Sequence, residues 1–262
     1  MLKRIARRLA FEVQHFPERV LASLPSDLKY RRGMIDMESS IANAQRAGFT
    51  PASIIDIGAY HGDWSRMVRR IYPNTPIFML EANPEMESHI AKAAVEVGNA
   101  KYRVALLGPK PDPSVLFHVM ETGSSVFADK SLMPRSATRL SMTTLDEVLS
   151  KAGDLAAPHF LKLDVQGYEL EVLRGAERVL AKTEVALLEV SLIEFNEGAP
   201  LFAEVVAFMA ARGLVTYDIS GFSRRESDRA LFQVDLLFAR ESSVLRSKRA
   251  FWKAEAKYAP QA

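Results

Sequence analysis

One stretch near the start of the chain, residues 54–63, constrains the fold more than any other. An apolar run there breaks into a loop whose two glycines, Gly58 and Gly62, stand four positions apart, and a helix-like segment begins near Trp64. A second apolar run follows and ends in the acid Glu81. In parallel α/β sheets, a glycine loop after one strand and an acid after the next meet at the carboxyl edge, where nucleoside ligands bind. The stretch therefore predicts a doubly wound α/β fold with a nucleoside-type site.

The spacing of this loop indicates which nucleoside ligand it would take. The loop lacks the Gly-x-Gly-x-x-Gly spacing that cradles the pyrophosphate of nicotinamide or flavin dinucleotides, so a dehydrogenase is disfavoured. It reads Asp56-x-Gly58-x-x-x-Gly62 instead, a variant suited to a ligand without a phosphate. Glu81 would accept hydrogen bonds from both ribose hydroxyls, because a carboxylate has two acceptor oxygens. We therefore predict S-adenosylmethionine as the cofactor and methyl transfer as the reaction.

Composition sets outer bounds on this prediction. A chain of 262 residues that is 48% hydrophobic and 25% charged has the make-up of a globular protein with one large domain. It contains no cysteine, which excludes disulfides, thiolate catalysis and cysteine-bound metals and is compatible with a cytoplasmic location. No apolar run approaches the roughly 20 residues needed to span a bilayer. A net charge of +2 is too small to indicate nucleic-acid binding.

Between residues 39 and 240 the chain alternates strand-like and helix-like segments, as a doubly wound, mostly parallel sheet requires. The predicted strands cover residues 53–57, 77–81, 102–107, 115–120, 159–165, 185–190, 215–219 and 232–239. The predicted helices cover residues 39–47, 64–71, 85–96, 168–181 and 201–211, and a short helix starts after a capping box at Thr144. Since no linker or internal repeat interrupts this pattern, we expect residues 39–240 to form one domain.

The two ends of the chain are basic, and we expect them to form helical extensions over residues 1–38 and 241–262. Apolar residues recur at helical spacing between residues 1 and 13, which predicts a basic amphipathic helix. Such a helix either contacts an anionic membrane surface peripherally or packs, solvated, on the domain or on a partner subunit. Both interpretations stay open, and the apolar faces of the terminal helices also make a homo-oligomer plausible.

A second polar cluster lies in the segment 159–171. Lys162 and Asp164 interrupt an otherwise apolar predicted strand, and being two positions apart they project from the same face. Asp164 falls where this strand would leave the sheet, at the same carboxyl edge as Gly58 and Glu81. Charges in such strands are rare unless they are paired or lie beside a cleft. The pair is therefore either a structural ion pair or part of a site.

Six short motifs, taken in order, resemble those of the FkbM-type methyltransferases. They are DIGA at 56–59, EANP at 81–84, TGSS at 122–125, TLD at 144–146, LKLDVQGYE at 161–169 and LEV at 188–190. The resemblance runs from about residue 39 to residue 239, and the first motif combined with the fifth is its most specific part. It implies a seven-stranded class I methyltransferase fold, S-adenosylmethionine as donor and a hydroxyl acceptor on a sugar or polyketide-like product. One departure is Tyr60, which stands where the family usually has asparagine.

The residues at the predicted carboxyl edge receive roles on this basis. Those expected to bind the cofactor are Asp56, Gly58, Ala59, Gly62, Glu81, Ala82 and Asp164. An alcohol loses its proton as the methyl bond forms, so a general base within hydrogen-bond reach is expected. The candidate catalytic residues are Asp164 as first choice of base, Glu189 as second and His61 as third, together with Lys162. No metal site is predicted.

Other classes of function stay open at this point. The expected acceptor is a small molecule or a glycan, and no nucleic acid is expected as a partner. A nucleic-acid methyltransferase would use the basic termini to follow phosphates, although the central part of the chain lacks interleaved aromatic and basic residues. A non-catalytic module that keeps the nucleoside site but lacks turnover is a second alternative, which Tyr60 leaves open.

Overall fold

The computed structural model describes residues 35–119, 124–126, 136–153, 155–194 and 196–247. The predicted basic amphipathic helix at the amino end, most of the basic tail and the first two residues of the TGSS motif lie outside these described residues. The membrane-contact prediction is therefore untested. In the described part of the chain, no helix is both long enough and apolar enough to cross a bilayer.

The helices and strands follow the predicted alternation. The strands are β1 Ser53–Ile57, β2 Ile77–Glu81, β3 Ala100–Val104, β4 Leu106–Leu107, β5 Asp112–Val119, β6 Ser136–Thr143, β7 His159–Leu163, β8 Thr183–Ser191, β9 Leu214–Arg224 and β10 Leu231–Arg240. The α-helices are α3 Met37–Arg46, α4 Asp63–Ile71, α5 Glu87–Val97, α6 Leu145–Ala152, α7 Glu169–Arg174, α8 Glu177–Lys182 and α9 Phe202–Ala210. Two short 3₁₀ helices are η1 Pro84–Met86 and η2 Val244–Arg246.

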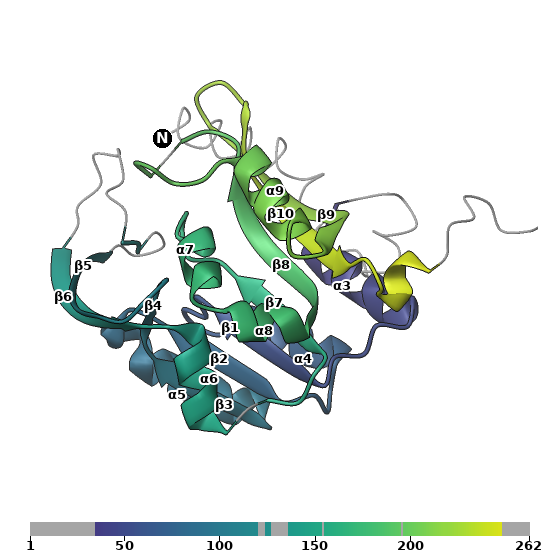
Figure 1. Cartoon of the computed structure of the whole chain (residues 1–262), viewed down its shortest axis with the longest axis horizontal. Coiled ribbons are helices and arrows are strands. Elements are labelled where there is room, and N and C mark those ends of the chain that lie inside the picture. The colour runs from purple at the N-terminus through teal and green to yellow at the C-terminus, as the bar shows by residue number, and fades with distance from the viewer. Residues whose placement is uncertain (1–34, 120–123, 127–135, 154, 195, 248–262) are drawn as a thin grey trace, which may run out of the picture.

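Seven strands form one twisted sheet in the order β3-β2-β1-β7-β8-β10-β9 (Figure 1). Strands β1, β2, β3, β7 and β8 pair in parallel, while β10 runs antiparallel to both β8 and β9. The predicted doubly wound, mostly parallel sheet is thus confirmed. The chain builds outward from β1 in one direction and then returns to place β7 on its other side. The carboxyl ends of β1 and β7 therefore flank a topological switch point, where such sheets bind their ligands.

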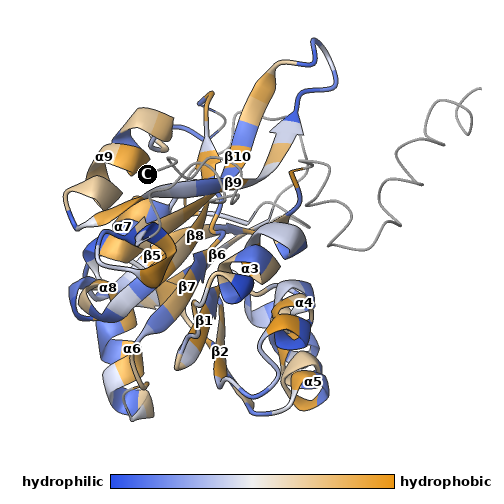
Figure 2. Ribbon diagram, turned by 90° about the vertical axis from the view of Figure 1, so that its right-hand side faces the viewer, coloured by the Kyte–Doolittle hydropathy of each residue, from blue (hydrophilic) through white to orange (hydrophobic). Residues whose placement is uncertain are grey.

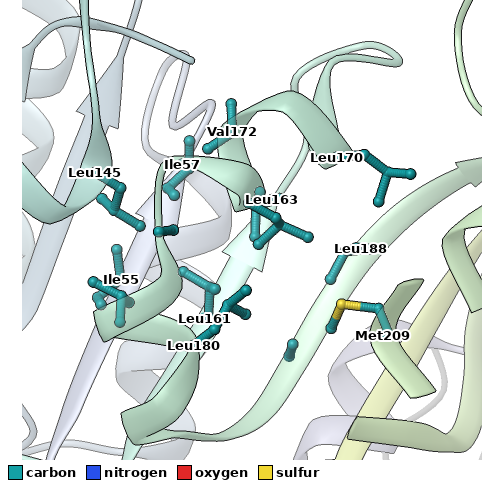
Figure 3. Packing of buried hydrophobic residues seen from close by; sticks show 14 of the residues in the cluster. Ile55, Ile57, Leu145, Leu161, Leu163, Leu170, Val172, Leu180, Leu188 and Met209 are labelled. Atoms are coloured by element: carbon teal, nitrogen blue, oxygen red, sulfur yellow. The ribbon is translucent and has the colours of Figure 1, made fainter. Parts of the chain in front are cut away.

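Two hydrophobic cores cover the two faces of this sheet. Figure 2 shows α6, α7, α8 and α9 on one side of the strands and α3, α4 and α5 on the other. All side chains of β1, β2 and β7 are buried, because a parallel strand between two helical layers has no solvent face. Figure 3 shows the first core, in which strand residues such as Ile55, Leu161 and Leu188 face Leu145, Leu180 and Met209 of the helices.

The prediction of a single helix over residues 168–181 is wrong, because two helices, α7 and α8, occupy that segment. Gly175 ends the first of them. A Cβ atom on Gly175 would lie 2.1 Å from the carbonyl oxygen of Gly108, so the two backbones touch where no side chain fits. This close approach is a tertiary constraint that the helical periodicity of the segment does not reveal.

A second, three-stranded sheet of order β4-β6-β5 lies beside the main one and was only partly predicted. The predicted strand 102–107 is divided at Ala105, whose N–H donates to the carbonyl of Glu81 before Leu106 and Leu107 join β6. The expected extra strand over 115–120 is present as β5, but β6 was missed. Most side chains of β6 are exposed and polar, so this strand lacks the apolar alternation that marks a half-buried strand.

The capping box predicted at Thr144 is half formed. The Thr144 hydroxyl accepts a hydrogen bond of 3.1 Å from the Glu147 N–H at the start of α6, as predicted. The Glu147 carboxylate accepts from the hydroxyl of Thr143 at 2.7 Å instead of from the backbone of the cap residue. The helix thus begins where the sequence indicates, and the second half of the box ties it to the end of β6.

Candidate functional site

The loop after β1 depends on two glycines with positive φ. Gly58 has φ of 74° and Gly62, which begins α4, has φ of 80°. A Cβ atom on Gly58 would lie 1.8 Å from the carbonyl oxygen of Asp164, so the loops after β1 and β7 run in direct backbone contact. Gly62 meets the Ala93 side chain of α5 in the same way, at 2.4 Å from a hypothetical Cβ. Glycine is needed at both positions for its conformation and for its lack of a side chain.

Glu81 ends β2 and is held by backbone donors. Its Oε2 accepts from the Tyr60 N–H at 2.8 Å and its Oε1 accepts from the Asn83 N–H at 2.9 Å. Burial raises the pKa of this carboxyl, an effect that these two hydrogen bonds and the Lys162 ammonium oppose. The Ala82 N–H opposes the rise as well. Glu81 is therefore oriented by backbone N–H groups of the glycine loop and of its own turn.

A cavity of about 290 Å³ opens at the switch point between β1 and β7. Four predicted cofactor-binding residues line it, namely Gly58, Glu81, Ala82 and Asp164. The remaining predicted site residues are not part of its lining: Asp56, Ala59, Gly62, His61, Lys162 and Glu189. Residues that the sequence reasoning did not single out also line it, including Phe117, Val126, Gln166, Tyr168 and Val172. These come from β5, the segment 124–126, the turn after β7 and α7, and spacing in the sequence does not connect all of these parts.

Asp56 and Lys162 form a buried ion pair beneath the cavity. The Lys162 Nζ lies 3.2 Å from Asp56 Oδ1 and donates to the carbonyl of Gly58 at 2.9 Å. Burial alone would lower the pKa of the Lys162 ammonium, but Asp56 and Asp164 outweigh it and raise that pKa. Asp56 is fully buried and also accepts from the Ser65 hydroxyl at 2.7 Å. The structural alternative considered from the sequence paired Lys162 with Asp164, whereas its nearer partner is Asp56, and this pair fixes the glycine loop from below.

Asp164 follows β7 and faces the cavity. Its side chain is 40% exposed, and its Oδ2 lies 3.9 Å from the Lys162 Nζ. Its Oδ1 accepts from the Gln166 side-chain amide at 2.9 Å. Asp164 therefore combines solvent access with two polar neighbours that fix its orientation.

Glu189, on β8, does not line the cavity but contacts Gln166, which does. Its Oε2 accepts from the amides of Gln166 and Gln233, each at 3.0 Å. Burial, assisted by the charge of Asp164, raises the pKa of Glu189 to about 9. The neighbouring Asp235 has its pKa raised by burial to about 6. At neutral pH Glu189 is therefore a protonated acid next to the Asp164 carboxylate.

Glu169 closes the turn between β7 and α7. Its Oε1 accepts from the N–H groups of Val165 and Gly167 at 3.0 and 3.2 Å. Burial raises the pKa of this side chain to about 7 in spite of these bonds. The residue is buried and absent from the cavity lining, so it shapes the turn from behind.

His61 lies in a stack of rings on the glycine loop. Its ring is parallel to that of Tyr60 with centroids 3.9 Å apart, and it stacks on His89 of α5 at 4.4 Å. Tyr60 lines the cavity, but its contact with Glu81 is made by the backbone N–H. The presence of tyrosine at position 60, where the family usually has asparagine, therefore leaves that backbone hydrogen bond in place. The φ of Tyr60 is 48°, in the left-handed region that asparagine tolerates better.

The ring stack predicts energetic coupling between Tyr60 and His61. We expect the double-mutant cycle of Tyr60→Asn and His61→Ala to give a coupling of about 0.5–1.5 kcal/mol in the free energy of unfolding. Tyr60→Asn alone should change stability little, because the relief of positive φ offsets the lost stack. Urea denaturation of the four proteins measures both quantities. A coupling indistinguishable from zero would contradict a stabilising stack.

Comparisons with known proteins identify a family and several similar structures. A model of the methyltransferase FkbM domain matches residues 56–215. Similar solved structures include a precorrin-6y C5,15-methyltransferase from Geobacter metallireducens, with 16% identity over 77% of this chain and 86% of that chain and a TM-score of 0.42. Another is magnesium protoporphyrin IX methyltransferase from Synechocystis PCC 6803 with bound S-adenosylmethionine, with 12% identity, coverage of 78% and 77%, and a TM-score of 0.43.

The N-terminal domain of EvdMO1 with bound S-adenosylhomocysteine is also similar, with 10% identity, coverage of 78% of this chain and 81% of that chain, and a TM-score of 0.45. No match was found among curated proteins. The residues matched by the family model span well over half of the chain and include the glycine loop, Glu81, Asp164 and Glu189. The chain therefore belongs to the FkbM family of S-adenosylmethionine-dependent methyltransferases.

Proposed function

We propose that this methyltransferase transfers the methyl group of S-adenosylmethionine to a hydroxyl of a sugar, glycan or polyketide-like metabolite. The observation that carries the proposal is the presence of Glu81 and Asp164 in the lining of one cavity. The first carboxylate is suited to hold the ribose of the cofactor and the second to receive the acceptor's proton. Gly58, in backbone contact with Asp164, lines the same cavity.

The cavity fits the cofactor in its chemistry. Glu81 lines the cavity, and the two oxygens of a carboxylate suit the two adjacent hydroxyls of a ribose. Apolar side chains such as Leu80, Leu107 and Val172 line other parts of the cavity and offer a surface for an adenine ring. When bound, S-adenosylmethionine supplies an electrophilic methyl group. The residues of the chain then have to align the acceptor, exclude water and remove one proton.

Asp164 is the best candidate for the general base among the four proposed catalytic residues. Lys162 is held as a charged ammonium by Asp56 and Asp164 and has no lone pair to offer. The pKa of Glu189 is raised to about 9, so this acid already carries a proton at neutral pH. His61 is stacked on the outer side of the loop and does not line the cavity. Asp164 alone of the four lines it.

A small acceptor is favoured over a nucleic acid by the charge of the cavity. The described residues that line it include no lysine or arginine, whereas phosphate contacts of nucleic-acid enzymes depend on such side chains. The presence of Asp164 in the lining likewise favours an enzyme over a module that only binds nucleosides. Location in the cytoplasm and contact with a membrane surface stay predictions from the sequence.

Calorimetric titration with S-adenosylhomocysteine tests the cofactor site. We expect the wild type to bind and Glu81→Ala to bind at least about 100-fold more weakly, because two hydrogen bonds to a charged group are lost. Glu85→Ala, which removes an exposed acid four residues further along, serves as the matched control and should bind like the wild type. Circular dichroism confirms that all three proteins are folded. Equal affinities of the wild type and Glu81→Ala would refute the assignment of Glu81.

A further inference from the structure

The turn after β7 contains two consecutive residues with positive φ, one of which is not glycine. Gln166 has φ of 56°, in the left-handed region that side chains other than glycine and asparagine rarely adopt. Gly167, which follows it, has φ of 93°. Strained residues of this kind persist only where their surroundings fix them, and they gather at functional sites. The contacts of Gln166 show what fixes this conformation.

Gln166 connects four separate parts of the structure. Its side-chain Nε2 donates to Asp164 Oδ1 at 2.9 Å and to Glu189 Oε2 at 3.0 Å. Its carbonyl oxygen accepts from the Ser125 hydroxyl at 3.1 Å and from the Asn196 amide at 2.6 Å. These partners lie after β7, on β8, in the segment bridged to β5, and in the loop after β8. Together they hold both the strained backbone and the side-chain amide.

The side-chain amide of Gln166 lies between the acidic side chains of Asp164 and Glu189. Leu163 pairs with Leu188 in the parallel β7–β8 ladder, so Asp164 and Glu189 occupy neighbouring positions across the two strands. Glu189 pairs in turn with Asp235 on β10. The two N–H bonds of a single amide nitrogen point to different acceptors, so one Gln166 side chain serves both acids. Glu189 carries its proton at neutral pH, which limits the repulsion on Asp164.

The amide also fixes the plane of the Asp164 carboxylate. Gln166 bonds to Oδ1, while Oδ2 lies toward Lys162 at 3.9 Å. A neutral donor at Oδ1 orients the group without the charge neutralisation that a lysine or arginine in its place would cause. The direction of the carboxylate is thus set from both of its oxygens.

We propose that Gln166 is a positioning residue that aims the Asp164 carboxylate at the transferring methyl group and the acceptor hydroxyl. This inference rests on the proposed function, because it takes Asp164 as the group that faces the reaction centre. Gln166 acts through Asp164 and is not itself required to touch either reactant. It follows that altering Gln166 weakens binding of the positively charged sulfonium end of the cofactor more than binding of its nucleoside end.

Two cofactor analogues separate these parts of the site without a known acceptor. S-adenosylhomocysteine has a neutral sulfur, whereas sinefungin carries a protonated amine where the methylsulfonium would be. Calorimetry gives the affinity of each analogue for the wild type, Gln166→Met, Gln166→Asn and Asp164→Asn. Asparagine tolerates the positive φ but is too short to span both acids, so it separates the loss of the amide bridge from backbone strain. Gln45→Met on α3, remote from the cavity, is the matched amide-to-thioether control.

We expect both Gln166 variants and Asp164→Asn to lose about tenfold or more of the preference for sinefungin over S-adenosylhomocysteine, with Gln45→Met unchanged. Loss in Asp164→Asn but not in either Gln166 variant would overturn the positioning role and leave the proposed function intact. No loss in Asp164→Asn would show that Asp164 does not face the methyl group, which removes the basis of both. Failure of the folded wild type to bind S-adenosylhomocysteine would overturn the proposed function, and with it the positioning role that rests on it.

Discussion

Replacing Lys162 with methionine is expected to lower the free energy of unfolding by about 3–5 kcal/mol, because it strands a buried charge. Asp56 is fully buried, and the Lys162 ammonium 3.2 Å away is its ionic partner. The same ammonium donates to the carbonyl of Gly58, so the glycine loop loses a donor as well. The midpoint and slope of urea denaturation, followed by circular dichroism, measure the effect.

Two further variants make this prediction specific. Lys92→Met removes a lysine from an exposed ion pair with Glu96 and is expected to cost no more than about 1 kcal/mol. The double variant Asp56→Asn/Lys162→Met leaves no fully buried charge unpaired, because Asp164 is 40% exposed, and the new amide can still accept from Ser65, so it should recover most of the loss. If Lys162→Met were no more destabilising than Lys92→Met, the buried pair would not be the anchor of the loop.

The buried parallel strands could be predicted from the sequence because their environment is uniform. The predicted bounds of β1 and β2 agree with the structure at both ends, since each is an apolar run closed by a polar or glycine residue. The same pattern placed Glu81 at the carboxyl edge and Asp164 near the end of the predicted strand 159–165, which stops at Leu163 in the structure, and both residues line the cavity. Strand β6 escaped prediction because its exposed side chains lie on an outlying sheet and carry no apolar periodicity.

The details of the site depend on contacts between distant residues, which no local pattern contains. The glycine at position 58 is readable as a turn, but its necessity comes from the carbonyl of Asp164, more than a hundred residues away. Gln166 is similarly placed by Glu189, Ser125 and Asn196. Its one local indication was its place within the LKLDVQGYE motif beside Gly167. The proposal of Asp164 over Glu189 as base also drew on the structure, because burial raises the pKa of Glu189.

Replacing Asp164 with asparagine is expected to lower the turnover number for methyl transfer by about 10²–10⁴-fold. An alcohol is a poor nucleophile until its proton leaves, and an amide cannot receive that proton. Asparagine keeps the size of the side chain and an oxygen to accept from Gln166, so the cavity should keep its shape. Affinity for S-adenosylhomocysteine should therefore change little. Turnover is measured with methyl-labelled S-adenosylmethionine and an acceptor found by screening polyhydroxylated metabolites.

Glu189→Gln is the matched comparison, because it makes the same carboxyl-to-amide change at the neighbouring position. Since Glu189 is already uncharged at neutral pH and serves as an acceptor for Gln166 and Gln233, we expect its turnover to stay within about tenfold of the wild type. The two variants together decide which acid receives the proton. A large loss of turnover in Glu189→Gln with near-normal turnover in Asp164→Asn would identify Glu189 as the base. It would also imply that Glu189 loses its proton when the acceptor binds.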